Sequence, residues 1–137
     1  MSRYLGVDYG ERRIGLALSD PLGIIAKPFT IIDTKKERYP SKKIAAIASE
    51  NEVIGIVVGI PYTLQGTESP QTIKVQKFIE SLKQSTYTKI IGVDERLSSV
   101  SAEKALIEQG VKTGHNKGRI DETAAAIILQ EYLDSKS

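Results

Sequence analysis

Short apolar segments, separated by glycine and polar residues, make up the first quarter of the chain. Residues 3–9 and 14–19 are two such segments on either side of Gly10, and this pattern predicts the two strands of a hairpin. A third segment, residues 24–33, is rich in Ile and Thr, and Pro28 within it favours the edge of a sheet. The pattern therefore predicts that an antiparallel meander opens the fold.

After residue 39, apolar residues at helical spacing alternate with continuous apolar runs. The runs at 53–59 and 89–93 predict strands that are buried on both faces. The element order β-β-β-α-β-α-β-α-α predicts an α/β fold in one domain, residues 1–137, with a mixed sheet and helices on both of its faces. The helices are expected to begin at Pro40, after a Ser69 cap, at Ser98 or Ser99, and after an Asp121 cap.

Composition narrows the possible chemistry. The chain has no cysteine and one histidine, which excludes a disulfide framework and argues against a histidine-rich zinc site. Its longest apolar run, residues 53–60, is far shorter than the about 20 residues that span a membrane. Arg3 is followed closely by Asp8, so we expect no signal peptide and a cytoplasmic protein. A net charge of +2 permits nucleic-acid binding without requiring it.

Acidic residues stand at the ends of three predicted elements. Asp8 ends the first strand, Asp94 and Glu95 end the last strand, and Asp121 begins the last helix. Parallel strands deliver their carboxyl ends to one edge of a sheet, so these acids are expected to lie together. Carboxylate oxygens suit Mg²⁺ or Mn²⁺, and such ions can activate water and stabilise the leaving oxygen of a phosphodiester. We therefore predict that Asp8, Glu95 and Asp121 are metal ligands and catalytic residues.

Each acid also has a structural interpretation. Asp8 could satisfy turn amides, and Asp121 could be a plain helix cap. Asp94 or Glu95 could pair with Arg96. Adjacent strand residues point to opposite faces, so only one of Asp94 and Glu95 joins the cluster easily, and the longer Glu95 is favoured.

Basic residues accompany the acids along the chain. Cations around an acidic cluster suit a polyanion whose phosphates approach a bound metal, whereas the alternative is a set of solvated loop charges. His115 is interpreted as a surface polar residue rather than a general base. The predicted nucleic-acid contacts are Arg12, Arg13, Arg96, Asn116, Lys117 and Arg119.

Several motifs follow one another along nearly the whole chain. They are Gly6-Val7-Asp8-Tyr9-Gly10, Val57-Val58-Gly59-Ile60-Pro61, Asp94-Glu95-Arg96-Leu97-Ser98-Ser99, Asn116-Lys117-Gly118 and Ile120-Asp121. Together they resemble the YqgF family of small RuvC-like proteins. The resemblance implies an RNase H-like fold with a five-stranded sheet of order 3-2-1-4-5 and strand two antiparallel. It also implies phosphodiester cleavage with a divalent metal, and places the family acids on Asp8, Glu95 and Asp121.

The chain departs from the wider RuvC-like pattern at the end of the fourth strand. Those resolvases carry an acid there, whereas this chain has Gly59-Ile60-Pro61. Glu95, one strand further along, would have to take that role.

The resemblance makes an endonuclease that processes the 5′ end of pre-16S rRNA during ribosome biogenesis the leading hypothesis. Expected partners are nucleic acid, with RNA preferred over structured DNA, and a pre-ribosomal particle; no membrane partner is expected. A resolvase of four-way DNA junctions is an alternative and should be a symmetric dimer, whereas the predicted helices favour a monomer or weak homodimer. A non-catalytic nucleic-acid-binding module is an alternative of another class. An ATP-binding protein of the actin type is disfavoured, because the chain lacks a second phosphate hairpin.

Overall fold

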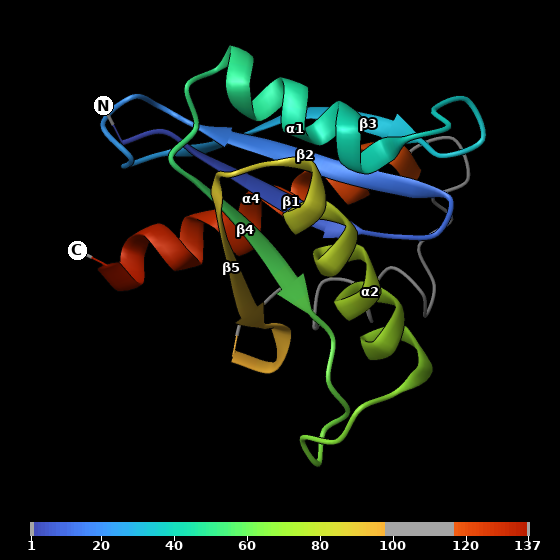
Figure 1. Ribbon diagram of the computed structural model, residues 1–137. Helices are drawn as coiled ribbons and strands as arrows, with labels where there is room; N and C mark the ends of the chain where they lie inside the picture. The colour runs from blue at the N-terminus through green and yellow to red at the C-terminus, as the bar shows by residue number, and fades with distance from the viewer. Residues whose placement is uncertain (1, 98–116, 137) are drawn as a thin grey trace.

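One mixed sheet forms the centre of the molecule (Figure 1). The computed structural model describes residues 2–97 and 117–136, with only the backbone of residues 117–123. The strand order is β3-β2-β1-β4-β5; β2 is antiparallel to β1 and β3, whereas β1, β4 and β5 are parallel. This confirms the predicted order and direction. The strands are β1 (Tyr4–Tyr9), β2 (Arg13–Ser19), β3 (Ala26–Asp33), β4 (Gly55–Ile60) and β5 (Lys89–Asp94).

Helices cover both faces of the sheet, as predicted. α1 (Pro40–Glu50) and α2 (Pro70–Ser85) pack on one face, and α4 (Lys117–Lys136) packs on the other (Figure 1). The short 3₁₀ helix η1 (Glu95–Leu97) follows β5. Ser69 caps α2 as predicted, because its side chain accepts the amide N–H of Thr72. The helix expected from Ser98 or Ser99 lies outside the described residues. No helix in the described part of the chain has the length and apolar character needed to cross a bilayer.

Strand alternation divides the buried residues of β1 between two cores. Leu5 and Val7 belong to the core under α1 and α2, and Tyr4 belongs to the core under α4. Since successive strand residues face opposite sides, Asp8 shares the α4 face with Tyr4 and Gly6. Tyr9 faces the other way and stacks on Phe78 of α2, with 4.5 Å between ring centroids.

Two element boundaries differ from the predictions. The strand expected over 24–33 begins at Ala26, because Asp20 accepts the amide hydrogens of Leu22, Ile24 and Ile25 and holds them in a loop. Asp121 is not the cap of the last helix, which begins four residues earlier at Lys117. Acidic residues are favourable throughout the first turns of a helix, so an aspartate there does not fix the first residue.

The approach of α4 to β1 depends on Gly6. A Cβ at position 6 would lie 2.8 Å from the carbonyl oxygen of Ala125 and 2.8 Å from Cβ of Leu129. Because one of these atoms is backbone, Gly6→Ala must push α4 off the sheet. We expect a loss of about 1–3 kcal/mol in the free energy of unfolding, measured by urea denaturation.

Gly92→Ala is the control for this variant. A Cβ at position 92 would meet only the end of the Ile60 side chain, at 2.6 Å from Cδ1. An unchanged urea midpoint for Gly6→Ala would contradict the close packing of α4 on β1.

Candidate active site

Asp8 has a glycine beside it on each neighbouring strand, and this leaves space around its side chain on the α4 face of the sheet. It is paired with Gly15 of β2 on one side. On the other side Val7 is paired with Val58, so the next residues along these strands, Asp8 and Gly59, lie side by side. Both neighbours of Asp8 are therefore glycines. The strands leave open the space on either side of this carboxylate, although only 4% of the residue is exposed.

Glu95 uses the space above Gly59. Its carboxylate lies on the α4 face, because a Cβ on Gly59 would be 2.8 Å from Glu95 Oε2 and 2.7 Å from Ile128 Cδ1 of α4. Glu95 is 5% exposed and begins η1, directly after β5. The turn into η1 thus directs this carboxylate across β4 toward the strand that carries Asp8.

The structure brings the predicted acids Asp8 and Glu95 together on one face, at the carboxyl ends of β1 and β5. Burying an ionised carboxylate costs several kcal/mol unless charge or hydrogen bonds compensate it. Two such groups over neighbouring strands suit a hard divalent cation such as Mg²⁺ or Mn²⁺, which takes carboxylate oxygens and retains water ligands. The donor set, which Gly59 lets Glu95 complete from the neighbouring strand, therefore fits a metal ion.

The third predicted acid, Asp121, lies in the first turns of α4, where only the backbone is described. α4 runs antiparallel to β1: Tyr132 packs on Tyr4 with 5.7 Å between ring centroids, and Ala125 lies over Gly6. Position 121 is four residues, about 6 Å along the helix axis, before Ala125, in the direction of Asp8. Among the side chains that are described, no three Asp, Glu, His or Cys residues form a metal-binding group.

Asp94 is held away from this pair of acids by Arg96. The Arg96 guanidinium donates to both carboxylate oxygens of Asp94, with Nη2 2.7 Å from Oδ2, and lies 5.8 Å from the ring centroid of Tyr62. These hydrogen bonds hold the pKa of Asp94 below its ordinary value and raise the pKa of Arg96. Asp94 thus forms the ion pair with Arg96 that was one of the two roles considered for it. Arg96, which the sequence predicts to contact nucleic acid, is already bound to a carboxylate.

This ion pair predicts how stability depends on pH. A carboxyl whose folded-state pKa lies below 3.8 contributes stability that is complete above pH 3.8 and is lost as the pH falls through the folded value. We expect Asp94→Asn protein to lose less stability than wild type between about pH 5 and pH 2. The measurement is the Tm by circular dichroism across this range, with Glu50→Gln at the end of α1 as control. The same acid dependence in Asp94→Asn and wild type would contradict this role of Asp94.

The turn between β1 and β2 carries two of the predicted nucleic-acid contacts. Arg12 Nε lies 3.3 Å from Oδ1 of Asp33, and Arg13 is the first residue of β2, paired with Asp33 across the strands. Lys74 of α2 forms an ion pair with Glu11. The hydrogen bond from the Lys35 amide and the charge of Arg12 lower the pKa of Asp33. Ion pairs and strand pairing thus fix the turn that carries Arg12 and Arg13, beside the end of β1 that carries Asp8.

The remaining predicted contacts are not described with side chains. Asn116 lies outside the described residues, and Lys117 and Arg119 lie in the first turn of α4, where only the backbone is described. Their roles stay predictions.

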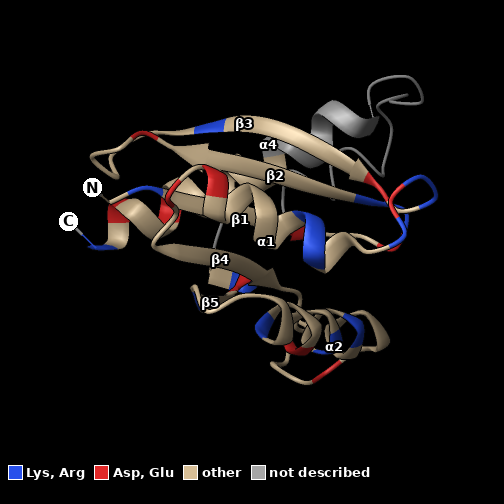
Figure 2. Ribbon diagram, turned by 45° about the horizontal axis from the view of Figure 1, so that its top comes forward, with Lys and Arg blue, Asp and Glu red and all other residues tan. Residues whose placement is uncertain are grey.

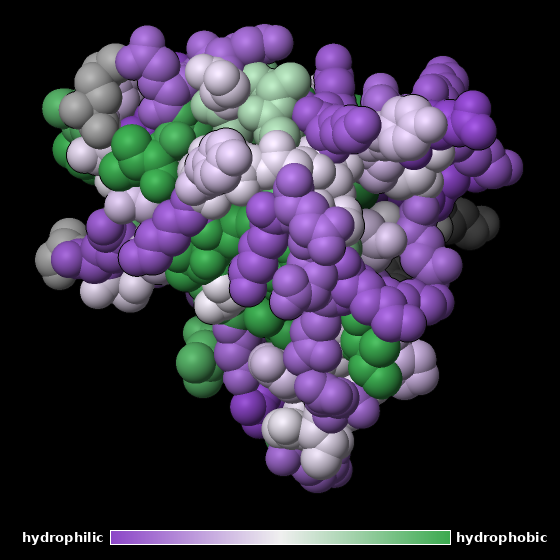
Figure 3. All heavy atoms as spheres, viewed as in Figure 1, coloured by the Kyte–Doolittle hydropathy of each residue, from purple (hydrophilic) through white to green (hydrophobic). Residues whose placement is uncertain are grey.

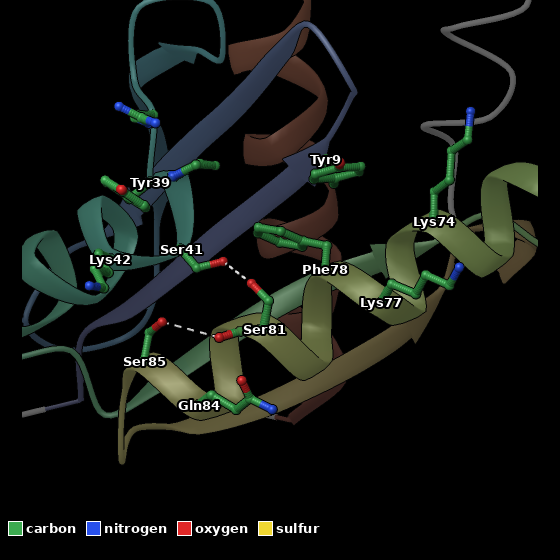
Figure 4. A pocket seen from close by; sticks show the side chains of 12 residues that line it. Tyr9, Tyr39, Ser41, Lys42, Lys74, Lys77, Phe78, Ser81, Gln84 and Ser85 are labelled. Atoms are coloured by element: carbon green, nitrogen blue, oxygen red, sulfur yellow. Dashed lines mark hydrogen bonds between the residues drawn. The ribbon is translucent and has the colours of Figure 1, made fainter.

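Sequence reasoning missed a groove between α1 and α2 on the opposite face of the sheet (Figure 4). We call it the α1–α2 groove; it has a volume of about 630 Å³. Lys74 and Lys77 are three residues apart on one helix, and this spacing indicates a basic helix face that forms part of the groove. Its lining consists of Tyr9, Arg38, Tyr39, Pro40, Ser41, Lys42, Lys74, Lys77, Phe78, Ser81, Gln84 and Ser85.

Comparison with known proteins gives both sequence relatives and structural neighbours. A profile of the family described as "RuvX: Holliday junction resolvase" matches residues 2–135. A protein of Roseiflexus sp. (strain RS-1), named "Putative pre-16S rRNA nuclease", is 42% identical over 134 residues, which cover 98% of this chain and 95% of that protein. A protein of Clostridium botulinum (strain Hall) with the same name is 42% identical over 135 residues and 98% of each chain.

Solved structures share the fold at low sequence identity. The T. thermophilus RuvC in complex with a Holliday junction substrate aligns with a TM-score of 0.62 at 15% identity, over 99% of this chain and 96% of RuvC. The Fowlpox virus resolvase in its complex with Holliday junction DNA aligns with a TM-score of 0.55 at 16% identity, over 98% of each chain. These neighbours identify the RNase H-like fold that the resemblance implied.

Proposed function

We propose that this chain, which belongs to the RuvX family and is a phosphodiester-hydrolysing nuclease, cleaves with a divalent metal held by Asp8, Glu95 and Asp121. The observation that supports this most strongly is the burial of Asp8 and Glu95 on one face, with Gly59 making room for Glu95. When bound, Mg²⁺ or Mn²⁺ would lower the pKa of a water molecule and stabilise charge on the leaving oxygen. The protein supplies the ligands, their orientation and a shielded position for the phosphate.

The individual residues have separate tasks in this proposal. Asp8 would hold the metal from β1, the central strand of the five. Glu95 reaches it from the end of β5 and serves in place of the acid that RuvC-like resolvases carry at the end of the fourth strand, because Gly59 leaves that position empty. Asp121 completes the ligand set from α4. Arg12, Arg13, Lys117 and Arg119 attract the phosphates of the substrate.

We propose the 5′ end of pre-16S rRNA as the substrate. The relatives that are 42% identical over nearly their whole length carry a name for this activity. A protein with this proposed activity would work in the cytoplasm, with a pre-ribosomal particle as its partner. Family members are also described as Holliday junction resolvases, and that substrate is the outcome to test against.

The experiment compares the two substrates under the same conditions. A labelled 16S rRNA precursor with its 5′ extension and a labelled four-way DNA junction are incubated with the protein and Mg²⁺ or Mn²⁺, with and without EDTA. We expect metal-dependent cleavage of the RNA at its 5′ extension and no paired cuts in the junction. Symmetric junction cleavage without RNA cleavage would reassign the protein to junction resolution. Binding of both substrates without any cleavage would contradict the proposed activity.

A further inference from the structure

We infer that the α1–α2 groove binds a single-stranded stretch of the substrate RNA beside the cleavage site. This inference rests on the proposed function, since it takes RNA as the substrate. It adds a second binding surface, on the face of the sheet opposite to Asp8 and Glu95.

The charge of the groove points to a polyanion. Arg38, Lys42, Lys74 and Lys77 line it, and its described lining includes no acidic residue. Lys74 forms an ion pair with Glu11. Among the side chains that are described, those of residues 2–97 and 124–136, no carboxylate oxygen lies within 4.0 Å of the charged groups of Arg38, Lys42 or Lys77. Figure 2 shows basic residues on both α1 and α2, and Figure 3 shows hydrophilic side chains over the outer surface of α2.

An exposed aromatic ring points to unpaired bases. Tyr39 is 56% exposed at the rim of the groove. The Lys42 Nζ lies 5.2 Å and the Arg38 Cζ 5.9 Å from its ring centroid. Proteins that bind single strands combine cations along the phosphate backbone with aromatic rings on which bases stack. A duplex keeps its bases stacked inside, so it cannot use Tyr39 in this way.

Contacts between side chains form the floor of the groove. Tyr9 stacks on Phe78, and the hydroxyl groups of Ser41 and Ser81 are hydrogen-bonded between α1 and α2 (Figure 4). The side chain of Ser85 donates to the carbonyl oxygen of Ser81 at 3.1 Å. The Ser41–Ser81 hydrogen bond joins α1 to α2, whereas the Ser85 bond lies within α2.

The groove also adjoins the active site. Tyr9, which lines it, follows Asp8 directly in β1, and the two side chains point to opposite faces of the sheet. One end of the groove thus lies at the strand end that carries the catalytic acid. An RNA strand that leaves the active site around this end of the sheet would enter the groove past Tyr9 and Lys74.

The test measures RNA binding without cleavage. Fluorescence anisotropy with a labelled single-stranded RNA oligonucleotide in EDTA compares two double variants. Lys42→Gln/Lys77→Gln removes two cations from the groove, whereas Lys43→Gln/Lys83→Gln removes two exposed lysines from the same two helices outside it. Tyr39→Ala is matched by Tyr87→Ala, whose fully exposed ring lies outside the groove.

We expect the groove pair to weaken binding about tenfold near physiological salt and to reduce the slope of log K against log salt by about 1.4. The control pair should change affinity by no more than about twofold. Tyr39→Ala should weaken binding at least about fivefold, and Tyr87→Ala should not. Equal losses in the two lysine pairs, or equal affinity for a duplex RNA of the same length, would overturn the inference.

The binding result is separate from the cleavage result. A protein that shows this binding pattern but does not cut the rRNA precursor would contradict only the proposed function. A protein that cuts normally while both lysine pairs bind alike would contradict only the role of the groove.

Discussion

Asp8→Asn protein is expected to cleave RNA at least about 10³-fold more slowly than wild type. The amide keeps the size of the side chain but removes the charge that holds a divalent cation. A metal ion contributes several kcal/mol to the stabilisation of a phosphoryl transition state, which corresponds to this change in rate. Single-turnover cleavage of the labelled 16S rRNA precursor, with metal and enzyme in excess, measures the effect on the chemical step.

Folding and RNA binding should survive this substitution. Asparagine matches the size of aspartate, so this residue, which is 4% exposed, can be replaced without a cavity or overpacking. Asp94→Asn is the matched control for activity, because Asp94 also ends a strand but pairs with Arg96. Loss of folding in Asp8→Asn would show that Asp8 is structural. An equal loss of cleavage in Asp94→Asn would contradict a specific role of Asp8 in cleavage.

Gly59→Ala should reduce cleavage about 10²-fold although it adds one methyl group. That methyl group would lie 2.8 Å from Glu95 Oε2 and 3.0 Å from its Cγ, so the Glu95 side chain must move from its place beside Asp8. Misplacement of a catalytic group by about 1 Å can cost about 10² in rate. The atoms that must move belong to side chains, and alanine suits a strand better than glycine. The free energy of unfolding should therefore change by about 1 kcal/mol or less.

Gly92→Ala separates this effect from a general effect on the sheet. Its new Cβ would press on Ile60 Cδ1, at 2.6 Å, in the adjacent strand on the α2 side. We expect near wild-type cleavage from Gly92→Ala at a similar stability. Normal cleavage by Gly59→Ala in the same assay would contradict the placement of Glu95 in the active site.

The sequence predicted the sheet well because its signals are local. The apolar runs of β1 and β2 on either side of Gly10, and Pro28 in the edge strand β3, are signals that lie within a few positions of one another. The strand order came from the resemblance to a family. The first residue of α4 was misplaced, because a helix start depends on weak preferences that an aspartate satisfies at several positions.

The positions of two acids in the candidate active site could be predicted from the order of the elements. Asp8 lies near the end of β1 and Glu95 directly follows β5, so topology alone places them at one edge of the sheet. Gly59 makes room for Glu95 only through the packing of the folded chain, so the sequence motif around Gly59 did not reveal this role. The α1–α2 groove was missed because its cations come from two helices about thirty residues apart, which only the tertiary fold brings together.

The most direct test of the active site is a calorimetric titration of Mn²⁺ into wild-type protein and three variants. Asp8→Asn and Glu95→Gln each remove a proposed ligand charge, whereas Asp94→Asn removes the neighbouring acid that pairs with Arg96. We expect saturable binding by wild type and Asp94→Asn, and an affinity at least about tenfold lower in the other two. Equal Mn²⁺ affinity in all four proteins would contradict a metal site formed by Asp8 and Glu95.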